Sequence, residues 1–249
     1  MLNCKFNIFI LFKIVSNKCR TSFWHFRNKK IFSYNHFLIS LLYYLVINLN
    51  YEKNYKKLFS KDRIELIKEN LKVLKPFILE VGVHKGEFSN ELLKSLYPKK
   101  LVLVDPWIAF EDTIYKNSWY GNSNHSNQQI QDKLYYETKK SFSKEIQENK
   151  VEILRETSDN FFLINKYKFD LIYIDGNHLY EFVKRDIDNS LNVLNENGII
   201  VLDDYNLTGW WSDGVTKAVK FYEEKKLIKV IKRHSIFEYH HQCLIKKYP

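Results

Sequence analysis

Residues 169–206 read FDLIYIDGNHLYEFVKRDIDNSLNVLNENGIIVLDDYN, and this stretch decides the fold. It opens with a short β-branched and aromatic run that ends at Asp175, which is typical of a buried strand. The apolar residues that follow keep the 3.6-residue period of a helix buried on one face: Leu179, Phe182, Val183, Ile187, Leu191 and Leu194. Asn197-Gly198 is expected to end that helix in a left-handed or turn conformation. GIIVLDDY then predicts a second buried strand that ends at Asp203 and Asp204.

A strand–helix–strand unit of this length favours a right-handed crossover between two parallel strands. The carboxyl ends of parallel strands meet at one edge of the sheet, where open α/β sheets bind ligands. Asp175, Asp203 and Asp204 are therefore expected to lie near one another. Carboxylates that are close together repel unless a positive charge separates them, and a hard divalent cation with oxygen ligands meets that need. The alternative is that one of these acids caps the next helix while the others are hydrated.

Length and composition predict a folded chain with one large domain, or one domain with an appendage. The chain has 249 residues, of which 45% are hydrophobic and 16% are aromatic, so a mostly disordered chain is not expected. The formal net charge is +10, yet residues 1–60 hold 10 Lys/Arg and one acid, and the other 189 residues hold 29 Lys/Arg and 28 Asp/Glu. The basic excess belongs to the front of the chain, so we do not expect the rest to bind nucleic acid.

The cysteines indicate a reducing compartment. Cys4, Cys19 and Cys243 are odd in number and far apart, and no CxxC or zinc-ligand spacing occurs. This usage is typical of a cytoplasmic protein.

The first 50 residues differ in composition from the rest, and their role stays open. The most hydrophobic window is IFSYNHFLISLLYYLVINL, residues 31–49, preceded by the basic aromatic run KCRTSFWHFRNKK at 18–30. Polar residues shorten its apolar part below the roughly 20 residues that span a bilayer. A membrane anchor, an interfacial helix and a packed element such as a lid, a dimer contact for a homo-oligomer or a targeting extension are all compatible. We therefore separate a basic hydrophobic extension, 1–50, from a domain at 51–249.

A second strand–turn–helix unit begins the domain. Residues 61–75 predict a helix that ends at Pro76, and FILEV at 77–81 predicts a strand. The following turn has the pattern Glu80-x-Gly82-x-x-x-Gly86, which is not the GxGxxG dinucleotide signature. Glycines there allow a tight turn and the approach of a ligand to a helix N-terminus, and a carboxylate can hold an ammonium group. A plain strand–helix turn has the same pattern.

The next strand, KKLVLVDPW, closes on Asp105, where an acid can accept both hydroxyls of a ribose. Trp107 can stack on an adenine or pack in the core. Residues 108–127 have no clear period, and a loop this long is usually functional, so we expect it to face the substrate. A helix is expected to follow at about 128–148. Ser158, after the strand at 151–156, can meet the adenine edge or cap a helix at 159–166. Seven strands are predicted in all, at 77–81, 100–105, 151–156, 169–175, 198–204, 228–234 and 237–246.

These motifs resemble those of the class I S-adenosylmethionine-dependent methyltransferases, and within them the branch of macrocin-type sugar O-methyltransferases. The resemblance covers about residues 60–247 and is carried by four motifs in the same order: ILEVGVHKG, LVLVDPW, YIDGNHLYE and GIIVLDDY. It implies an α/β fold with a Rossmann-like seven-stranded sheet, mostly parallel with an antiparallel last strand, and with helices on both faces. An N-terminal helical extension is expected to precede that domain.

The resemblance also implies roles for individual residues. Glu80, Gly82 and Gly86 match the motif around the methionine part of the cofactor, Asp105 matches the ribose-binding acid, and Ser158 falls at an adenine contact. Asp175, Asp203 and Asp204 match the Mg²⁺ ligands of the metal-dependent branch, and Asp175 also borders the cofactor and the reaction centre. His178 occupies the place of a general base. Its alternative role is a hydrogen bond that only orders the turn.

The expected function is therefore Mg²⁺-assisted transfer of a methyl group from S-adenosylmethionine to a hydroxyl of a small molecule such as a sugar. The expected location is the cytoplasm, with membrane association through residues 1–50 left open. The alternative is a catalytically silent or scaffold protein of the same fold, attached to a membrane through its N-terminus. A nicotinamide-dependent oxidoreductase is disfavoured by the spacing of Gly82 and Gly86.

Overall fold

The computed structural model describes residues 62–118, 120–121, 126–236 and 240–248. The chain divides into two units, residues 1–56 and 57–249, and all described residues belong to the second. The predicted extension at 1–50 lies outside the described residues, so its three interpretations stay predictions. Within the described ranges, no helix is both long enough and apolar enough to cross a bilayer.

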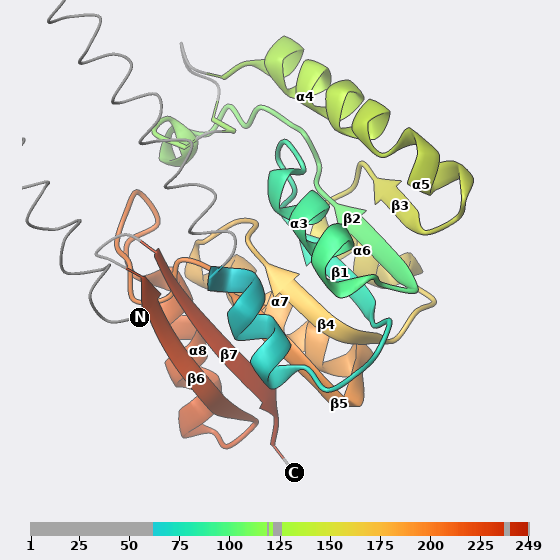
Figure 1. The fold of residues 1–249 in the computed structure, drawn as a ribbon. Coiled ribbons are helices and arrows are strands. Elements are labelled where there is room, and N and C mark those ends of the chain that lie inside the picture. The colour runs from blue at the N-terminus through green and yellow to red at the C-terminus, as the bar shows by residue number, and fades with distance from the viewer. Residues whose placement is uncertain (1–61, 119, 122–125, 237–239, 249) are drawn as a thin grey trace, which may run out of the picture. The chain divides into compact units, whose positions relative to one another are not determined.

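A seven-stranded sheet in the order β3-β2-β1-β4-β5-β7-β6 forms the centre of the domain (Figure 1). The strands are β1 (Phe77–Val81), β2 (Lys100–Val104), β3 (Val151–Leu154), β4 (Phe169–Ile174), β5 (Leu194–Leu202), β6 (Ile228–Ile236) and β7 (His240–Lys247). β1 to β5 pair in parallel, and β7 inserts antiparallel between β5 and β6. The predicted Rossmann-like sheet with a reversed last strand is confirmed.

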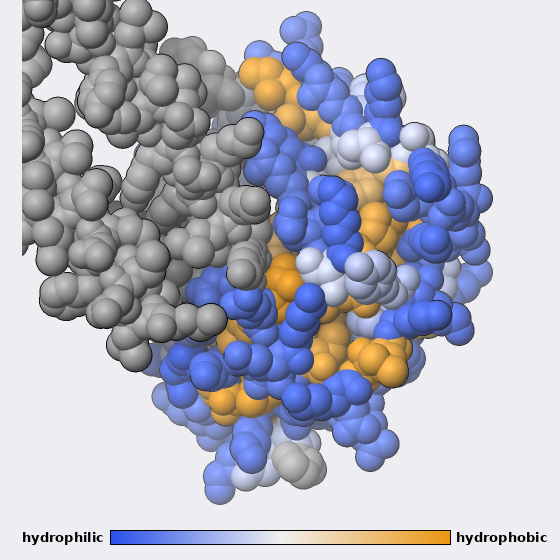
Figure 2. Space-filling model, viewed as in Figure 1, coloured by the Kyte–Doolittle hydropathy of each residue, from blue (hydrophilic) through white to orange (hydrophobic). Residues whose placement is uncertain are grey.

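Helices cover both faces of the sheet, because each buried strand alternates its side chains between two apolar layers (Figure 1). One layer packs on α6 (Ser158–Ile164), α7 (Tyr180–Val193) and α8 (Gly214–Glu224). The other packs on a helix at 62–70, α3 (Glu87–Leu96), α4 (Gln128–Ser141) and α5 (Ser143–Gln147). A short 3₁₀ helix, η1 (Thr113–Tyr115), lies between β2 and α4. On the face seen in Figure 2, hydrophilic residues surround scattered apolar ones.

The boundary between α7 and β5 corrects the sequence prediction. The helix ends at Val193, and β5 begins at Leu194, so Asn197-Gly198 lies inside the strand. The pairing of β5 with β4 shifts register before Leu171 and Ile199 become partners. A Cβ on Gly198 would lie 2.8 Å from Cδ1 of Leu194, so this glycine makes room for a side chain and does not adopt a left-handed turn.

Two other helices are shorter than their periodicity suggested. The helix predicted at 61–75 ends at residue 70. Leu74, which continues the apolar helical pattern in the sequence, is 94% exposed and does not pack in the core. The helix predicted at about 128–148 is interrupted at Phe142, whose side chain is buried in the core below α3. Tertiary packing overrides propensity at both sites.

Candidate active site

The carboxyl ends of β1, β4 and β5 meet at one edge of the sheet. Val81 pairs with Ile174, and Ile174 pairs with Leu202, so the residues that follow these strands are neighbours. The backbone N–H of Asp203 donates to the carbonyl of Ile174 at 3.0 Å, and that of Asp175 donates to the carbonyl of Val81 at 2.8 Å. Parallel pairing thus brings the two strand-end acids together, as expected from the sequence.

A cavity of about 540 Å³ opens at this edge. Its walls come from the loop after β1, the end of β2, the start of α6, the loop after β4 and the loop after β5. The chemically informative lining residues are Arg63, Glu80, Gly82, Asp105, Ile108, Phe110, Tyr120, Ser158, Asp175, His178, Asp204, Trp210 and Trp211. Six of the predicted cofactor or catalytic positions therefore lie on one cavity: Glu80, Gly82, Asp105, Ser158, Asp175 and His178.

Glu80 is the most deeply buried acid on this wall. It is 2% exposed, and its Oε2 makes no hydrogen bond within the described part of the chain. Burial raises the pKa of its carboxyl to about 8, although the Ser89 hydroxyl and the Arg63 guanidinium act in the opposite direction. An orphaned buried acceptor is costly unless a donor arrives, so this oxygen is suited to a cationic or hydrogen-bonding ligand.

The two glycines of the β1 turn have different tasks. A Cβ on Gly82 would lie 2.1 Å from the carbonyl oxygen of Asp175, and its φ is +89°, so only glycine allows the ends of β1 and β4 to come this close. Gly86 precedes α3 at φ +70° and does not line the cavity. A Cβ there would lie 2.8 Å from Cε2 of Phe142, so Gly86 serves packing against the α4–α5 junction.

Asp105 holds the glycine turn from the end of β2. Its Oδ2 accepts the backbone N–H groups of Val83 and His84 at 2.9 and 3.0 Å, and its Oδ1 accepts that of Trp107 at 2.8 Å. A carboxylate has about four acceptor positions, so Oδ1 keeps capacity for a ligand hydroxyl.

Trp107 is a core residue. Its side chain is 1% exposed, its indole N–H donates to the His84 carbonyl at 2.9 Å, and its ring packs on Tyr135. It does not line the cavity, so the structure does not support stacking of Trp107 on an adenine. Ile108 lines the cavity from the same segment.

Ser158 lines the cavity at the first residue of α6, but it does not cap that helix. The cap is Thr157, whose hydroxyl accepts from the backbone N–H of Asn160 at 3.2 Å. Asp186 is buried in α7, and burial raises the pKa of its carboxyl to about 7, although the Ser158 hydroxyl acts in the opposite direction.

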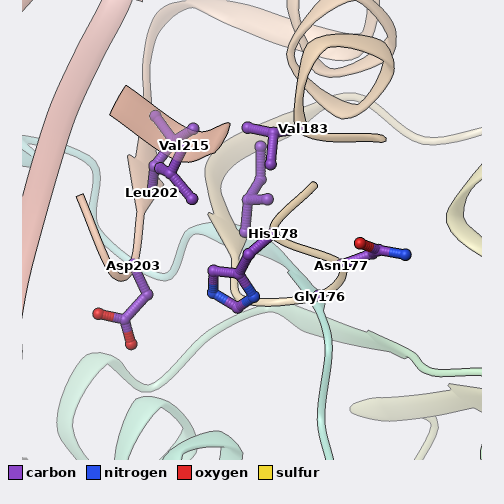
Figure 3. Close-up of a pocket in the computed structure, with 8 residues that line it drawn as sticks. Gly176, Asn177, His178, Val183, Leu202, Asp203 and Val215 are labelled. Carbon is purple, nitrogen blue, oxygen red and sulfur yellow. The ribbon is translucent and has the colours of Figure 1, made fainter. Parts of the chain in front are cut away.

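His178 lies between two acids on the loop after β4. Its Nε2 is 3.6 Å from Oδ1 of Asp175 and 3.4 Å from Oδ2 of Asp204, and it makes no hydrogen bond within the described residues. Burial lowers the pKa of the imidazole, against the effects of Asp203 and a backbone hydrogen bond to Gly176. Burial therefore favours the neutral form of the ring, which is able to accept a proton. Figure 3 shows Asp203 to one side of the ring and the aliphatic side chains of Leu202, Val215 and Val183 above it in the view.

Asp175 and Asp204, which form an acidic rim with Asp203 at this edge of the sheet, both have raised pKa values. Burial raises the pKa of Asp204 to about 7, and the neighbouring Asp203 acts in the same direction. Burial, with Asp203 and Asp204 nearby, raises the pKa of Asp175 well above its ordinary value. Carboxyls this close cannot all ionise cheaply, so the rim shares protons when empty.

Asp203 differs from the other acids because four donors occupy its carboxylate. Oδ2 accepts from the Arg63 guanidinium at 3.1 Å and from the Tyr173 hydroxyl at 2.9 Å, while Oδ1 accepts from the Gln242 amide at 2.6 Å and from the backbone N–H of Asp204 at 3.1 Å. The pKa of Asp203 is lowered despite its burial, because Arg63 and these donors favour the anion.

The donor set predicted for Mg²⁺ therefore does not fit this arrangement. A hard cation needs free carboxylate oxygens, and those of Asp203 are saturated by protein donors, one of which is itself a cation. Among the described residues, no group of three or more His, Cys, Asp or Glu side chains is arranged to hold a metal ion. Asp175 and Asp204 alone do not make the predicted site of three carboxylates.

Several cavity residues were not singled out from the sequence. Arg63 is the most informative, because it is spaced four and eight residues before Ile67 and Leu71, both buried. An arginine in register with an apolar stripe signals a buried cation, and this signal was available. The loop at 108–127 was expected to face a ligand, and its Phe110 and Tyr120 do line the cavity.

The comparisons with known proteins agree with this fold. The family model described as "Methyltransferase domain" matches residues 79–205. The search of curated proteins gave no match. Solved structures are similar in fold at low identity, over about three quarters of the chain.

Three of these structures illustrate the range. The O-methyltransferase TomG from Streptomyces achromogenes, solved with SAM, has a TM-score of 0.52 and 13% identity over 76% of this chain and 79% of its own. The N-methyltransferase NodS from Bradyrhizobium japonicum has a TM-score of 0.51 and 16% identity, over 77% of this chain and 98% of its own. A ribosomal protein L11 methylase from Lactobacillus delbrueckii has a TM-score of 0.51 and 15% identity, over 76% of this chain and 79% of its own.

Proposed function

The chain belongs to the methyltransferase-domain family, and on this premise we propose that it transfers the methyl group of S-adenosylmethionine to a hydroxyl of a small molecule such as a sugar. One observation carries the proposal. A single cavity joins the buried, unpartnered acceptor of Glu80 to the neutral imidazole of His178 and the carboxyl of Asp204. The end at Glu80, called the cofactor half below, suits a cationic cofactor. The end at His178 and Asp204, called the acceptor half, suits removal of a proton from the hydroxyl that receives the methyl group.

The residues present fit the cofactor. When bound, S-adenosylmethionine supplies an electrophilic methyl group on a sulfonium. Glu80 Oε2 would accept from its ammonium group, and Asp105 Oδ1 would accept from a ribose hydroxyl. Ser158 would border the adenine, and Asp175 would border the sulfonium, whose charge an acidic wall favours.

The chain's own task in the reaction is to orient the acceptor and take its proton. His178 would accept the hydroxyl proton at Nε2. The Asp204 carboxyl at 3.4 Å, whose pKa is about 7, would ionise beside the imidazolium that results and stabilise it, and the Asp175 carboxyl lies 3.6 Å away. Burial of the ring excludes water from the base. No step needs a metal ion in this account.

The acceptor half of the cavity favours a small hydroxylated ring over a nucleic acid. Aromatic side chains line it, with Tyr120 and Trp210 packed edge to face at 5.7 Å. The Tyr120 hydroxyl and the Trp211 indole N–H are buried and make no hydrogen bond in the described part of the protein. Apolar ring faces with a few unpaired donors suit a sugar or a phenol. Residues 61–249 carry a nearly balanced charge, which does not suit RNA.

Binding and turnover test the proposal separately. Isothermal titration calorimetry and thermal shift with S-adenosylhomocysteine should report binding to the purified full chain. Cofactor labelled in its methyl group should then transfer label to small molecules of a cell extract and not to its RNA. Label found in RNA or protein would show that the methyl acceptor is a macromolecule and would contradict the proposed small-molecule acceptor. The absence of both cofactor binding and label would leave the scaffold interpretation.

A further inference from the structure

The strongest unassigned feature is the cation that the helix at 62–70 inserts into the acidic rim. Arg63 is 9% exposed, and its guanidinium lies 4.0 Å above the ring centroid of Phe88. Its Nη1 is 3.1 Å from both the Tyr173 hydroxyl and Oδ2 of Asp203. Arg63 also lines the cavity, so its charge faces the ligand space.

This guanidinium acts on every buried acid of the rim. Its Nη1 forms an ion pair with Oδ2 of Asp203 at 3.1 Å, and Glu80, Asp175 and Asp204 line the same cavity as the guanidinium. A divalent cation between these carboxylates would have the same electrostatic role. Arg63 therefore already supplies the positive charge that clustered acids require.

The contact continues through Asp203 to the reaction centre. Asp203 Oδ1 accepts the backbone N–H of Asp204, and Asp204 has a φ of +53°, a left-handed conformation that is costly for a residue with a side chain. That conformation brings Oδ2 of Asp204 to 3.4 Å from Nε2 of His178. The anchored Asp203 carboxylate thus holds a strained turn in the orientation that faces the base.

We propose that Arg63 is a built-in replacement for a metal ion: it anchors Asp203, positions Asp204 against His178, and lets the site work without a divalent cation. The inference rests on the proposed function. Arg63 is a positioning residue, because it acts on the base through Asp203 and Asp204. It corrects the expectation that Asp203 is a metal ligand.

Metal binding is tested first on the unmodified full chain. Mn²⁺ is titrated against the protein saturated with S-adenosylhomocysteine, and free Mn²⁺ is followed by electron paramagnetic resonance. All of the Mn²⁺ is expected to stay free. Stoichiometric binding that disappears in Asp203→Asn would overturn the inference, because Asp203 would then be a ligand.

Positioning is tested by the imidazole NMR resonances of His178, assigned by their loss in His178→Asn. Arg63→Gln should shift these resonances, and Arg63→Lys should restore them in part, since lysine keeps the charge but lacks the two-sided fork of a guanidinium. Lys150→Gln is the control, because Lys150 pairs with Glu148 in an exposed segment before β3 and neither residue lines the cavity. Unchanged His178 resonances in a folded Arg63→Gln would refute the positioning role.

The two proposals fail in different ways. A chain that does not bind S-adenosylhomocysteine refutes the proposed function. A chain that binds it together with Mn²⁺ at Asp203 refutes only the role of Arg63. If Arg63→Gln does not fold, the Mn²⁺ measurement on the unmodified chain still decides the question.

Discussion

The imidazole Nε2 of His178 lies 3.4 Å from Oδ2 of Asp204, although the two residues follow different strands of the sheet. The contact joins the loop after β4 to the loop after β5. Gly214, at the start of α8, supports it from behind, because a Cβ there would lie 2.3 Å from the carbonyl oxygen of His178. Tight backbone packing therefore holds the base where the two loops meet.

Replacement of His178 by Asn should slow methyl transfer with little change in cofactor affinity. General-base catalysis typically contributes about 10²- to 10⁴-fold, so kcat should fall by that amount. Steady-state kinetics with an acceptor from the extract screen measures kcat, and calorimetry measures the affinity for S-adenosylhomocysteine. His241→Asn is the control, because His241 does not line the cavity. An unchanged kcat in His178→Asn would show that His178 only orders its loop.

Cofactor binding should release a proton from Glu80. The pKa of this carboxyl is about 8 in the empty cavity, so the group is mostly protonated at pH 7. An arriving ammonium or sulfonium charge favours the carboxylate and lowers that pKa. Calorimetry at pH 7 in buffers of different ionisation enthalpy should report proton release for the unmodified chain and none for Glu80→Gln. Equal heats in all buffers for the unmodified chain would contradict the prediction.

The ligand-free protein should lose stability between pH 5 and pH 8 through the same carboxyl. A folded-state pKa of about 8 exceeds the unfolded value, so the stabilisation is complete below pH 4 and is lost as the pH rises through 8. The melting temperature of Glu80→Gln should vary less over this range than that of the unmodified chain. Thermal unfolding at successive pH values tests this, and parallel curves for both proteins would be evidence against it.

Gly82→Ala should destabilise the domain by roughly 2 kcal/mol or more. A side chain at φ +89° is strained, and its Cβ would overlap the carbonyl of Asp175. Gly176→Ala is the matched control, because its Cβ would come no closer to any atom than 3.4 Å, the distance to Cγ1 of Val81. Chemical denaturation of both variants measures the difference in unfolding free energy. Similar losses for the two would mean that the close approach of β1 and β4 is not the constraint.

The Tyr120 hydroxyl and the Trp211 indole N–H should affect the binding of the methyl acceptor but not that of the cofactor. Trp211→Phe and Tyr120→Phe each remove one buried donor. A hydrogen bond contributes about 1 kcal/mol, so each variant should raise KM for the acceptor by roughly five- to tenfold. The affinity for S-adenosylhomocysteine should not change. If the variants bind S-adenosylhomocysteine more weakly and their KM for the methyl acceptor is unchanged, then Tyr120 and Trp211 contact the cofactor instead.

The sequence by itself determined the order of strands and helices and the side of the sheet on which the site lies. Apolar runs and helical periods are local, and each strand of the parallel sheet ends near an acid or a glycine turn, as at Glu80, Asp105 and Asp175. The βαβ rules then place those ends at one edge without further information. The fold and the cavity wall formed by these residues follow from that pattern.

Only the tertiary structure decided how the side chains at that edge are partnered. Asp203 was predicted as a metal ligand, and it instead accepts from Arg63, 140 positions earlier, and from Gln242, 39 positions later. Trp107 was expected either to stack on an adenine or to pack in the core, and it is enclosed by the core. Local pattern records which residues are near a strand end, whereas the helix that covers the edge determines which donors reach them. Since carboxylate chemistry depends on those donors, the charge of this site is a property of the folded chain.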